Sequence, residues 1–269
     1  MSRCILGVLV LLCASASAFE FNHAADGTPI RWNAALPIRW SVPEGTPDNV
    51  RSTFVAALAQ WSEASGGALN FVEASGGITL NFNPDSKLGT AMAYTTCEVQ
   101  SGQILRANIE VNAHDYNWTS TYALFLAPAL LHELGHALGL GHPKSADSIT
   151  GSYLAEDPPT MWETLTLNAR TLHYDDILGL RTLYGLDTTF PNTFTCSEKH
   201  RGKVYTFTAS AAPADVYWNY GDGTSDAGGT HRFPRGGYTM QAESRGFTGS
   251  LFIQIGPVKA AAQRVPHRK

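Results

Sequence analysis

The chain has 269 residues, with 19 Lys+Arg against 23 Asp+Glu and a formal net charge of −4 at pH 7. Only 16% of the residues are charged, and this slightly acidic balance excludes a nucleic-acid binder that depends on phosphate contacts. The 43% of hydrophobic residues are enough to build a packed core, which excludes an intrinsically disordered chain. The nine histidines are ordinary in number, but three of them fall between His132 and His142.

The first 18 residues have the pattern of a secretory signal peptide. Arg3 precedes the apolar run Ile5–Leu12, and the small residues Ala16-Ser17-Ala18 predict cleavage after Ala18. A lipoprotein signal through Cys13 is the less favoured alternative, because the preceding leucine is bulky for that cleavage site. No later stretch has the roughly 18 apolar residues of a membrane span. We therefore expect a secreted, extracellular protein with no membrane anchor, which crosses the periplasm if its source is Gram-negative.

Cleavage after Ala18 would remove two of the four cysteines and leave Cys97 and Cys196. Two cysteines in an oxidising compartment often pair, so the sequence predicts a disulfide between them. Two separate buried thiols are the alternative.

The pattern up to residue 187 mixes short strands with three longer helices. The predicted strands and helices are, in chain order, a strand over 30–42, a helix from Asp48 as N-cap to the Gly66-Gly67 stop, strands over 69–72, 78–82, 90–95 and 107–111, and helices over 122–138 and 174–183. Pro128 indicates either a kink in the second helix or a true start near Ala127. This order predicts an α/β (α+β) domain, with a mixed twisted sheet that carries long helices on one face.

The sequence pattern changes near Asp187, where helical periodicity ends. Short strands are predicted over 203–209, 215–220 and 237–242, with Gly and Pro between them. The spacing predicts an all-β sandwich domain over residues 188–258, followed by a basic tail over 259–269.

The strongest motif is His132-Glu133-Leu134-Gly135-His136-Ala137-Leu138-Gly139-Leu140-Gly141-His142. Residues four apart lie on one face of a helix, so His132 and His136 can point at one metal ion. Gly139 tolerates the positive φ that would end the helix and return His142 as a third ligand. Three protein ligands leave a position open for water, which is typical of a catalytic zinc. The isolated histidines His114, His173, His200 and His231 are expected to be ordinary surface or core residues.

Glu133 follows a predicted ligand but points to another side of the helix. Zinc lowers the pKa of bound water to about 7, and a neighbouring carboxylate can take its proton and deliver it to a leaving amine. The motif therefore predicts peptide hydrolysis with Glu133 as the catalytic base.

These eleven residues resemble the zinc motif of the metzincin proteases, which also requires a downstream methionine turn. Met161, in Pro159-Thr160-Met161-Trp162, is the candidate for that turn, and the resemblance places it beneath the zinc as an apolar floor. Among metzincins, the chain most resembles the matrixins in the strand Ile38-Arg39-Trp40, the helix after it, and the segment 175–185. The resemblance covers roughly residues 28–186. It implies a protease domain over 19–187, one catalytic zinc ion and a protein or peptide substrate.

By the same resemblance, Gly89-Thr90-Ala91-Met92-Ala93-Tyr94 is similar to the edge strand that binds an extended substrate, with Ala91, Met92, Ala93 and Tyr94 as substrate-binding residues. A plain sheet strand is the alternative. The segment from Thr160 through Trp162 to Glu163 would form a wall of the substrate pocket.

The chain departs from the animal matrixins in three places. No cysteine lies between Ala18 and the first domain segment, so we expect no cysteine switch. The segment Asn108–Asn112 does not supply the His- and Asp-rich loop for a second zinc, and the need for calcium stays open. Pro143 follows the third histidine, and the loop to Met161 is longer than in the animal enzymes. These features favour a microbial type of matrixin.

The C-terminal region resembles a PKD-type β-sandwich. The resemblance rests on Trp218-Asn219-Tyr220-Gly221-Asp222-Gly223-Thr224 and on the later Gly237-Tyr238-Thr239. Asp222 is expected to hydrogen-bond its own backbone in a Gly-rich turn. A metal or catalytic pair formed by Asp222 and Asp226 is the less favoured alternative.

Two other functions remain in competition with a monomeric matrixin-type protease. One is a metzincin of another group, such as an astacin-like protease, against which Pro143 and the helix over 174–183 argue. The other is an adhesion or carbohydrate-binding protein that uses the PKD-like domain and has a non-catalytic zinc site. The intact Glu133 and the lack of a fourth ligand argue against that alternative.

Overall fold

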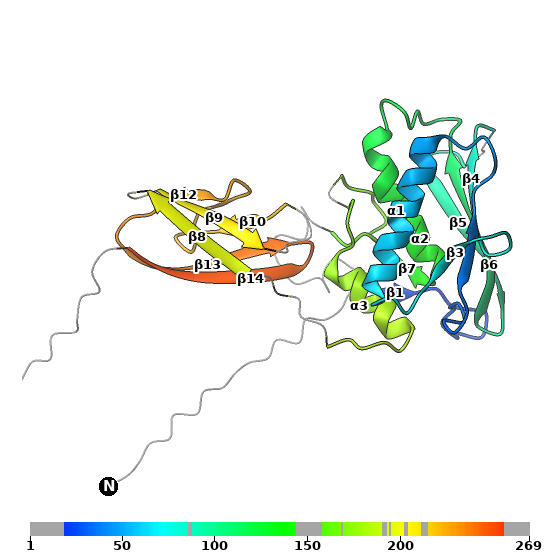
Figure 1. Cartoon of the computed structure of the whole chain (residues 1–269), viewed down its shortest axis with the longest axis horizontal. Coiled ribbons are helices and arrows are strands. Elements are labelled where there is room, and N and C mark those ends of the chain that lie inside the picture. The colour runs from blue at the N-terminus through cyan, green and yellow to red at the C-terminus, as the bar shows by residue number, and fades with distance from the viewer. Residues whose placement is uncertain are drawn as a thin grey trace, which may run out of the picture.

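The computed structural model describes residues 19–85, 88–143, 158–167, 169–189, 193, 195–201, 204–210 and 215–255. They form an N-terminal region of helices and strands, residues 19–189, and a C-terminal sandwich, residues 195–255 (Figure 1). The predicted signal peptide and basic tail, and most of the predicted loop over 143–160, lie outside the described residues. None of the described helices is long and apolar enough to span a membrane.

A five-stranded mixed sheet forms one layer of the N-terminal region. Its strands run in the order β3-β2-β4-β6-β5. Their bounds are β2 Ile38–Ser41, β3 Phe71–Glu73, β4 Ile78–Asn83, β5 Ala93–Gln100 and β6 Gln103–Asn112. The first four strands in this order pair in parallel, and β5 pairs antiparallel to β6 at the edge. The prediction of a mixed sheet is confirmed.

The helices α1 (Asp48–Ala64), α2 (Leu126–Ala137) and α3 (Tyr174–Leu183) lie on one face of this sheet (Figure 1). The helical spacing of Phe54, Leu58 and Trp61 predicts one apolar face of α1, and all three side chains are buried. Trp61 donates its indole N–H to the carbonyl oxygen of Leu131, 3.1 Å away, which joins α1 to α2. The helix that carries His132 and His136 is therefore held against α1 as well as against the sheet.

Two helix starts differ from the expectations or decide between them. Pro47 occupies the N-cap of α1, Asp48 is the first helical residue, and no side-chain cap forms, so the prediction of Asp48 as N-cap is wrong. A 3-10 turn over Ala123–Phe125 precedes α2, which begins at Leu126. Pro128 thus lies in the first turn, where backbone N–H groups lack intrahelical partners, and the helix needs no kink.

Three strand predictions need adjustment. The strand predicted over 30–42 is limited to β2, and Arg31 forms only an isolated bridge with Gln103. The predicted edge strand over 90–95 begins later, at Ala93. The pair of β1 (Glu20–Phe21) and β7 (Leu140–Gly141) was not predicted, because two residues are too few for a periodic pattern. This pair ties the start of the described chain to the segment just before His142.

The C-terminal sandwich consists of two antiparallel sheets, in the orders β11-β10-β13-β14 and β12-β9-β8. The strands are β8 Thr195–Arg201, β9 Val204–Ser210, β10 Tyr217–Asn219, β11 Ser225–Asp226, β12 Thr230–Arg232, β13 Gly236–Ser244 and β14 Phe247–Ile255. Phe207, Trp218, Tyr220 and Phe233 lie in its core, which is separate from the core of the N-terminal region. The all-β character of this region agrees with the prediction, although β8, β11, β12 and β14 were not foreseen.

The two cysteines among the described residues lie in different regions. Cys97 is half-buried on β5, Cys196 is buried on β8, and both are free thiols. The predicted disulfide is wrong, since each sulfur packs in the hydrophobic cluster of its own region.

Candidate active site

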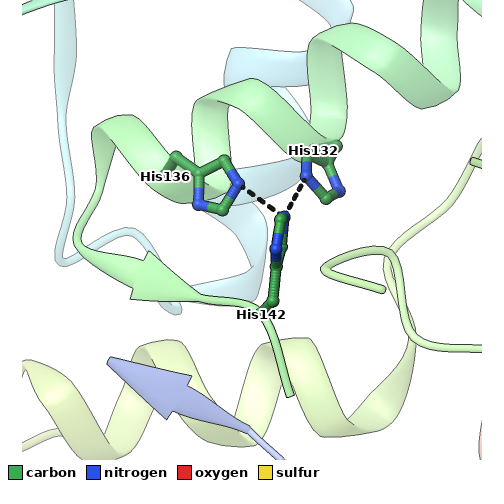
Figure 2. Close-up of side chains that lie close together, drawn as sticks. All are labelled: His132, His136 and His142. Carbon is green, nitrogen blue, oxygen red and sulfur yellow. Dashed lines mark hydrogen bonds between the residues drawn. The ribbon is translucent and has the colours of Figure 1, made fainter. Parts of the chain in front are cut away.

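The three histidines of the motif converge because a helix ends between them. His132 and His136 lie one turn apart on α2, on the same face. Gly139 has φ +100°, and a Cβ there would overlap the carbonyl oxygen of Ile30, so only glycine fits. The chain then enters β7, which carries His142 back toward the helix (Figure 2).

The ring nitrogens of these histidines point toward one place. The Nε2 atom of His142 lies 3.0 Å from Nε2 of His132 and 3.0 Å from Nε2 of His136 (Figure 2). Around a tetrahedral zinc ion with Zn–N distances of 2.0–2.1 Å, neighbouring nitrogens would be about 3.3 Å apart. The spacing therefore fits one small ion with three imidazole ligands. Among the described residues, this is the one group of three His, Cys, Asp or Glu side chains close enough to hold a metal ion.

The tautomers of two ligands are set by backbone carbonyls. Nδ1 of His132 faces the carbonyl oxygen of Thr160 at 2.8 Å, and Nδ1 of His136 faces that of Leu140 at 2.9 Å. Both Nδ1 atoms therefore carry the proton, and both Nε2 atoms present lone pairs to His142. A single proton on Nε2 of His142 can hydrogen-bond to only one of these lone pairs. A cation bound between the three nitrogens would accept all of them.

Burial keeps the ligands neutral, as metal binding requires. Loss of solvation, and then the charges of His136 and His142, lower the pKa of His132 to about 3. Loss of solvation also lowers the pKa of His136 to about 4, and it lowers that of the more exposed His142. All three imidazoles are thus available to a metal at neutral pH.

Glu133 is buried beside the ligands and has one defined partner. Burial raises the pKa of its carboxyl group to about 7, while the hydroxyl of Thr95 opposes this shift by hydrogen bonding. The Thr95 hydroxyl is 2.6 Å from Oε2 of Glu133 and 3.0 Å from its carbonyl oxygen. The sequence did not reveal this role of Thr95, since the two residues are 38 positions apart.

Met161 lies against α2. It is buried, and a Cβ on Gly135 would overlap its sulfur atom and crowd the ring of Trp61. The glycine inside the zinc motif therefore makes room for Met161 under the helix.

Asp176 holds the turn that carries Met161. Its carboxylate accepts hydrogen bonds from the backbone N–H groups of Thr160 (2.8 Å), Met161 (3.0 Å) and His173 (2.9 Å). The last of these bonds belongs to the capping box of α3, whose N-cap is His173. The sequence placed Asp176 in the first turn of a helix, but its contacts to the Met161 turn depend on the tertiary structure.

A cleft of about 1060 Å³ opens in front of the histidines. Residues of the edge strand line it, and so do Glu163, Thr164 and Leu165. The substrate residues predicted on the edge, Ala91, Met92, Ala93 and Tyr94, all line the cleft. Thr160, predicted as a wall, is instead buried beneath the site, and neither it nor Trp162 belongs to the lining.

Asp222, Asp226 and His231 of the sandwich form hydrogen bonds with nearby residues. Asp222 accepts hydrogen bonds from the backbone and side chain of Thr224 and pairs with His231 at 2.8 Å. Asp226 accepts one from the hydroxyl of Tyr220, 2.6 Å away. These contacts leave the alternative of an Asp222–Asp226 metal pair without support.

The profile of one protease family, Peptidase M10 or matrixin, matches residues 31–185, which is more than half of the chain. The chain belongs to the matrixin family. Its curated relatives include metalloendoproteinase 4-MMP and metalloendoproteinase 2-MMP of Arabidopsis thaliana. The first is 26% identical over 191 residues, covering 62% of this chain and 52% of the relative. The second is 27% identical over 185 residues, covering 61% and 45%. This matrixin thus spans about half the length of these relatives.

Two solved structures are also similar to this matrixin. High choriolytic enzyme 1, a hatching enzyme zinc-protease from Oryzias latipes, is 15% identical with a TM-score of 0.37, covering 65% of this chain and 98% of the enzyme. Myroilysin is 17% identical with a TM-score of 0.38, covering 58% and 96%.

Proposed function

We propose that this matrixin is a secreted zinc-dependent endopeptidase that hydrolyses peptide bonds in protein substrates, with Glu133 as the catalytic base. The observation that carries the proposal is the convergence of His132, His136 and His142 beside the buried Glu133, at the bottom of an open cleft. Family membership supports a zinc metalloprotease. When bound, zinc would polarise the substrate carbonyl and lower the pKa of water.

The protein's own groups supply binding and proton transfer. A substrate strand can lie beside β5, whose outer edge has no partner among the described strands. The Thr95 hydroxyl fixes Oε2 of Glu133, which leaves Oε1 to accept a proton as the water oxygen attacks the peptide carbon. Glu133 then gives this proton to the amide nitrogen as the C–N bond breaks, releasing an amine and a carboxylic acid, which ionises by losing its proton to solvent. A pKa of about 7 suits both directions of transfer.

The remaining parts of the proposal rest on the sequence. Residues 1–18 have the pattern of a signal peptide and support secretion. We propose a protease domain over 19–187, a PKD-like domain over 188–258 and a basic tail over 259–269. The proposed enzyme is a monomer of the microbial type, with one zinc ion and no nucleic-acid partner.

The test replaces Glu133 by alanine and by glutamine in the full chain. We expect both variants to retain zinc but to lose about 10²- to 10⁴-fold in kcat/KM on an unfolded protein substrate, because the base is absent. Glu98→Gln removes an exposed carboxylate on β5, the strand that carries Thr95. It is the matched control and should retain activity. A fully active Glu133→Ala variant would overturn the role of Glu133. Bound zinc without hydrolysis by the wild type, across a broad peptide library, would favour the binding protein instead.

A further inference from the structure

A buried arginine in the C-terminal sandwich reaches into the N-terminal region. Arg245 and Gly246 form the two-residue turn between β13 and β14, whose last pair is Ser244 and Phe247. In Figure 1 this end of the hairpin faces the N-terminal region. Both turn residues have positive φ, 50° for Arg245 and 75° for Gly246. An arginine in this backbone region is uncommon and unfavourable unless its surroundings hold it there.

The guanidinium group of Arg245 is hydrogen-bonded on all three nitrogens. Nε donates to the carbonyl oxygen of Thr171 at 3.0 Å, Nη1 to that of Pro158 at 2.9 Å, and Nη2 to the hydroxyl of Thr160 at 3.0 Å. The residue is only 1% exposed, so these contacts form away from water. Its fixed fork thus joins the segment before Met161 to the segment before α3.

The backbone and the neighbouring rings anchor the same turn. The carbonyl oxygen of Arg245 accepts a hydrogen bond from the N–H of Tyr174 at 2.8 Å. The rings of Tyr174 and Phe247 meet edge to face, with centroids 5.4 Å apart. A Cβ on Gly246 would overlap the ring of His173, so this close approach requires glycine.

Thr160 connects Arg245 to the metal site. Its hydroxyl accepts from Arg245, its N–H donates to Asp176, and its carbonyl oxygen faces Nδ1 of His132. The orientation of a ligating imidazole depends on the group that holds its other nitrogen. A continuous path of hydrogen bonds therefore runs from the tip of the sandwich to a zinc ligand.

The charge of Arg245 also suits this position. Asp176 is fully buried, and burial raises its pKa, while the positive charge of Arg245 is the largest factor that opposes the shift. A buried carboxylate is costly unless a cation and hydrogen bonds compensate it. Asp176 has both, and it holds the turn that contains Met161.

We infer that Arg245 is a positioning residue of the zinc site, through which the C-terminal sandwich becomes part of the active centre. The inference rests on the proposed zinc site at His132, His136 and His142. Arg245 fixes Thr160, and Thr160 fixes the ring of His132. Removal of the sandwich tip would therefore loosen the metal site and leave the substrate edge strand intact.

The test measures zinc affinity and catalysis separately in the full chain. The variants are Arg245→Ala, Arg245→Lys and Thr160→Val, with Thr160→Ser as the control that retains the hydroxyl. Arg232→Ala, at an exposed position of the same sandwich, controls for the loss of one positive charge. Zinc dissociation constants come from chelator competition, and absorption spectra of the cobalt-substituted proteins report ligand geometry.

We expect Arg245→Ala to weaken zinc binding about 10- to 100-fold, to change the cobalt spectrum and to lower kcat with little change in KM. Arg245→Lys should lose less zinc affinity and less kcat than Arg245→Ala, because lysine keeps the positive charge but not the three-donor fork. Thr160→Val should weaken zinc binding as much as Arg245→Lys does. The double variant with both substitutions should bind zinc no more weakly than either single variant. The two control variants should retain wild-type zinc affinity.

Wild-type zinc affinity and kcat in folded Arg245→Ala would overturn the inference. If that variant does not fold, additive effects of Arg245→Lys and Thr160→Val on zinc affinity would overturn it equally. A wild type that binds zinc at these histidines but cleaves nothing would contradict the proposed protease and still permit this test, because zinc affinity is measured directly.

Discussion

The N-terminal region and the C-terminal sandwich bury their polar side chains in different places. In the N-terminal region, His132, Glu133 and Asp176 lie inside, beside the motif helix and the turn beneath it. In the described part of the sandwich, Asp222 and Asp226 are exposed and hydrogen-bonded to nearby residues of the sandwich itself, and the fully buried polar residues are Ser244 and Arg245. Both lie at the hairpin end that contacts the N-terminal region.

This contrast indicates that the two regions use buried polar side chains differently. Burial of unpaired polar groups is costly, so most polar side chains of a folded domain stay at the surface. The sandwich follows this rule in its core, which is built from aromatic and aliphatic side chains. Arg245 departs from this rule, and its guanidinium group donates hydrogen bonds to Thr171, Pro158 and Thr160 of the other region. The sandwich therefore contributes a positioning contact more than a site.

The largest expected effect concerns the dependence of the zinc site on the sandwich, which predicts that unfolding of the sandwich lowers zinc affinity. Trp218 is buried in the sandwich core and lies 5.7 Å from the ring of Phe207, so Trp218→Ala should cost about 3–5 kcal/mol of unfolding free energy. We expect calorimetry to show the sandwich unfolding first, with zinc affinity falling across that transition. Phe252→Ala is the matched control, since this ring is 64% exposed and should matter far less. Zinc affinity that persists through the transition would separate the two regions.

A second change tests the N-terminal region alone. Thr95→Val removes the hydroxyl that holds the Glu133 carboxylate, and a hydrogen bond to a charged group contributes about 1.5–3 kcal/mol. We expect kcat/KM to fall roughly 10- to 100-fold while zinc affinity stays unchanged, whereas Arg245→Ala should lower zinc affinity as well. Thr95→Ser keeps the hydroxyl and should retain most of the activity. Equal activity of the valine variant would show that the bond does not orient the base.

The smallest effect is expected from reducing agents. Cys97 and Cys196 are free thiols in separate regions, so a reductant should leave the melting temperature unchanged. Loss of a native disulfide would typically cost about 2–5 kcal/mol and lower that temperature. A clear decrease would mean that a covalent bond, and not the Arg245 turn alone, couples the two regions.

Local patterns were sufficient for the centre of the site. The fourfold spacing of His132 and His136 on a helix, and the glycine at position 139, predicted three converging imidazoles. The nitrogens lie 3.0 Å apart in two of the three pairs. The helical spacing of Phe54, Leu58 and Trp61 likewise predicted the buried face of α1. In each case the residues that interact are close in sequence or share one repeating face.

The sequence by itself thus determined the metal-binding motif, its helix and the mixed fold, since regular secondary structure relates neighbours by a fixed period. The tertiary structure alone decided which residues support that motif. Asp176 meets the Met161 turn across 15 positions, Thr95 meets Glu133 across 38, and Arg245 meets Thr160 across 85. No periodic rule relates residues at such separations. They meet because separate helices, an edge strand and a hairpin pack together, and only the folded chain shows which polar groups then have to satisfy one another.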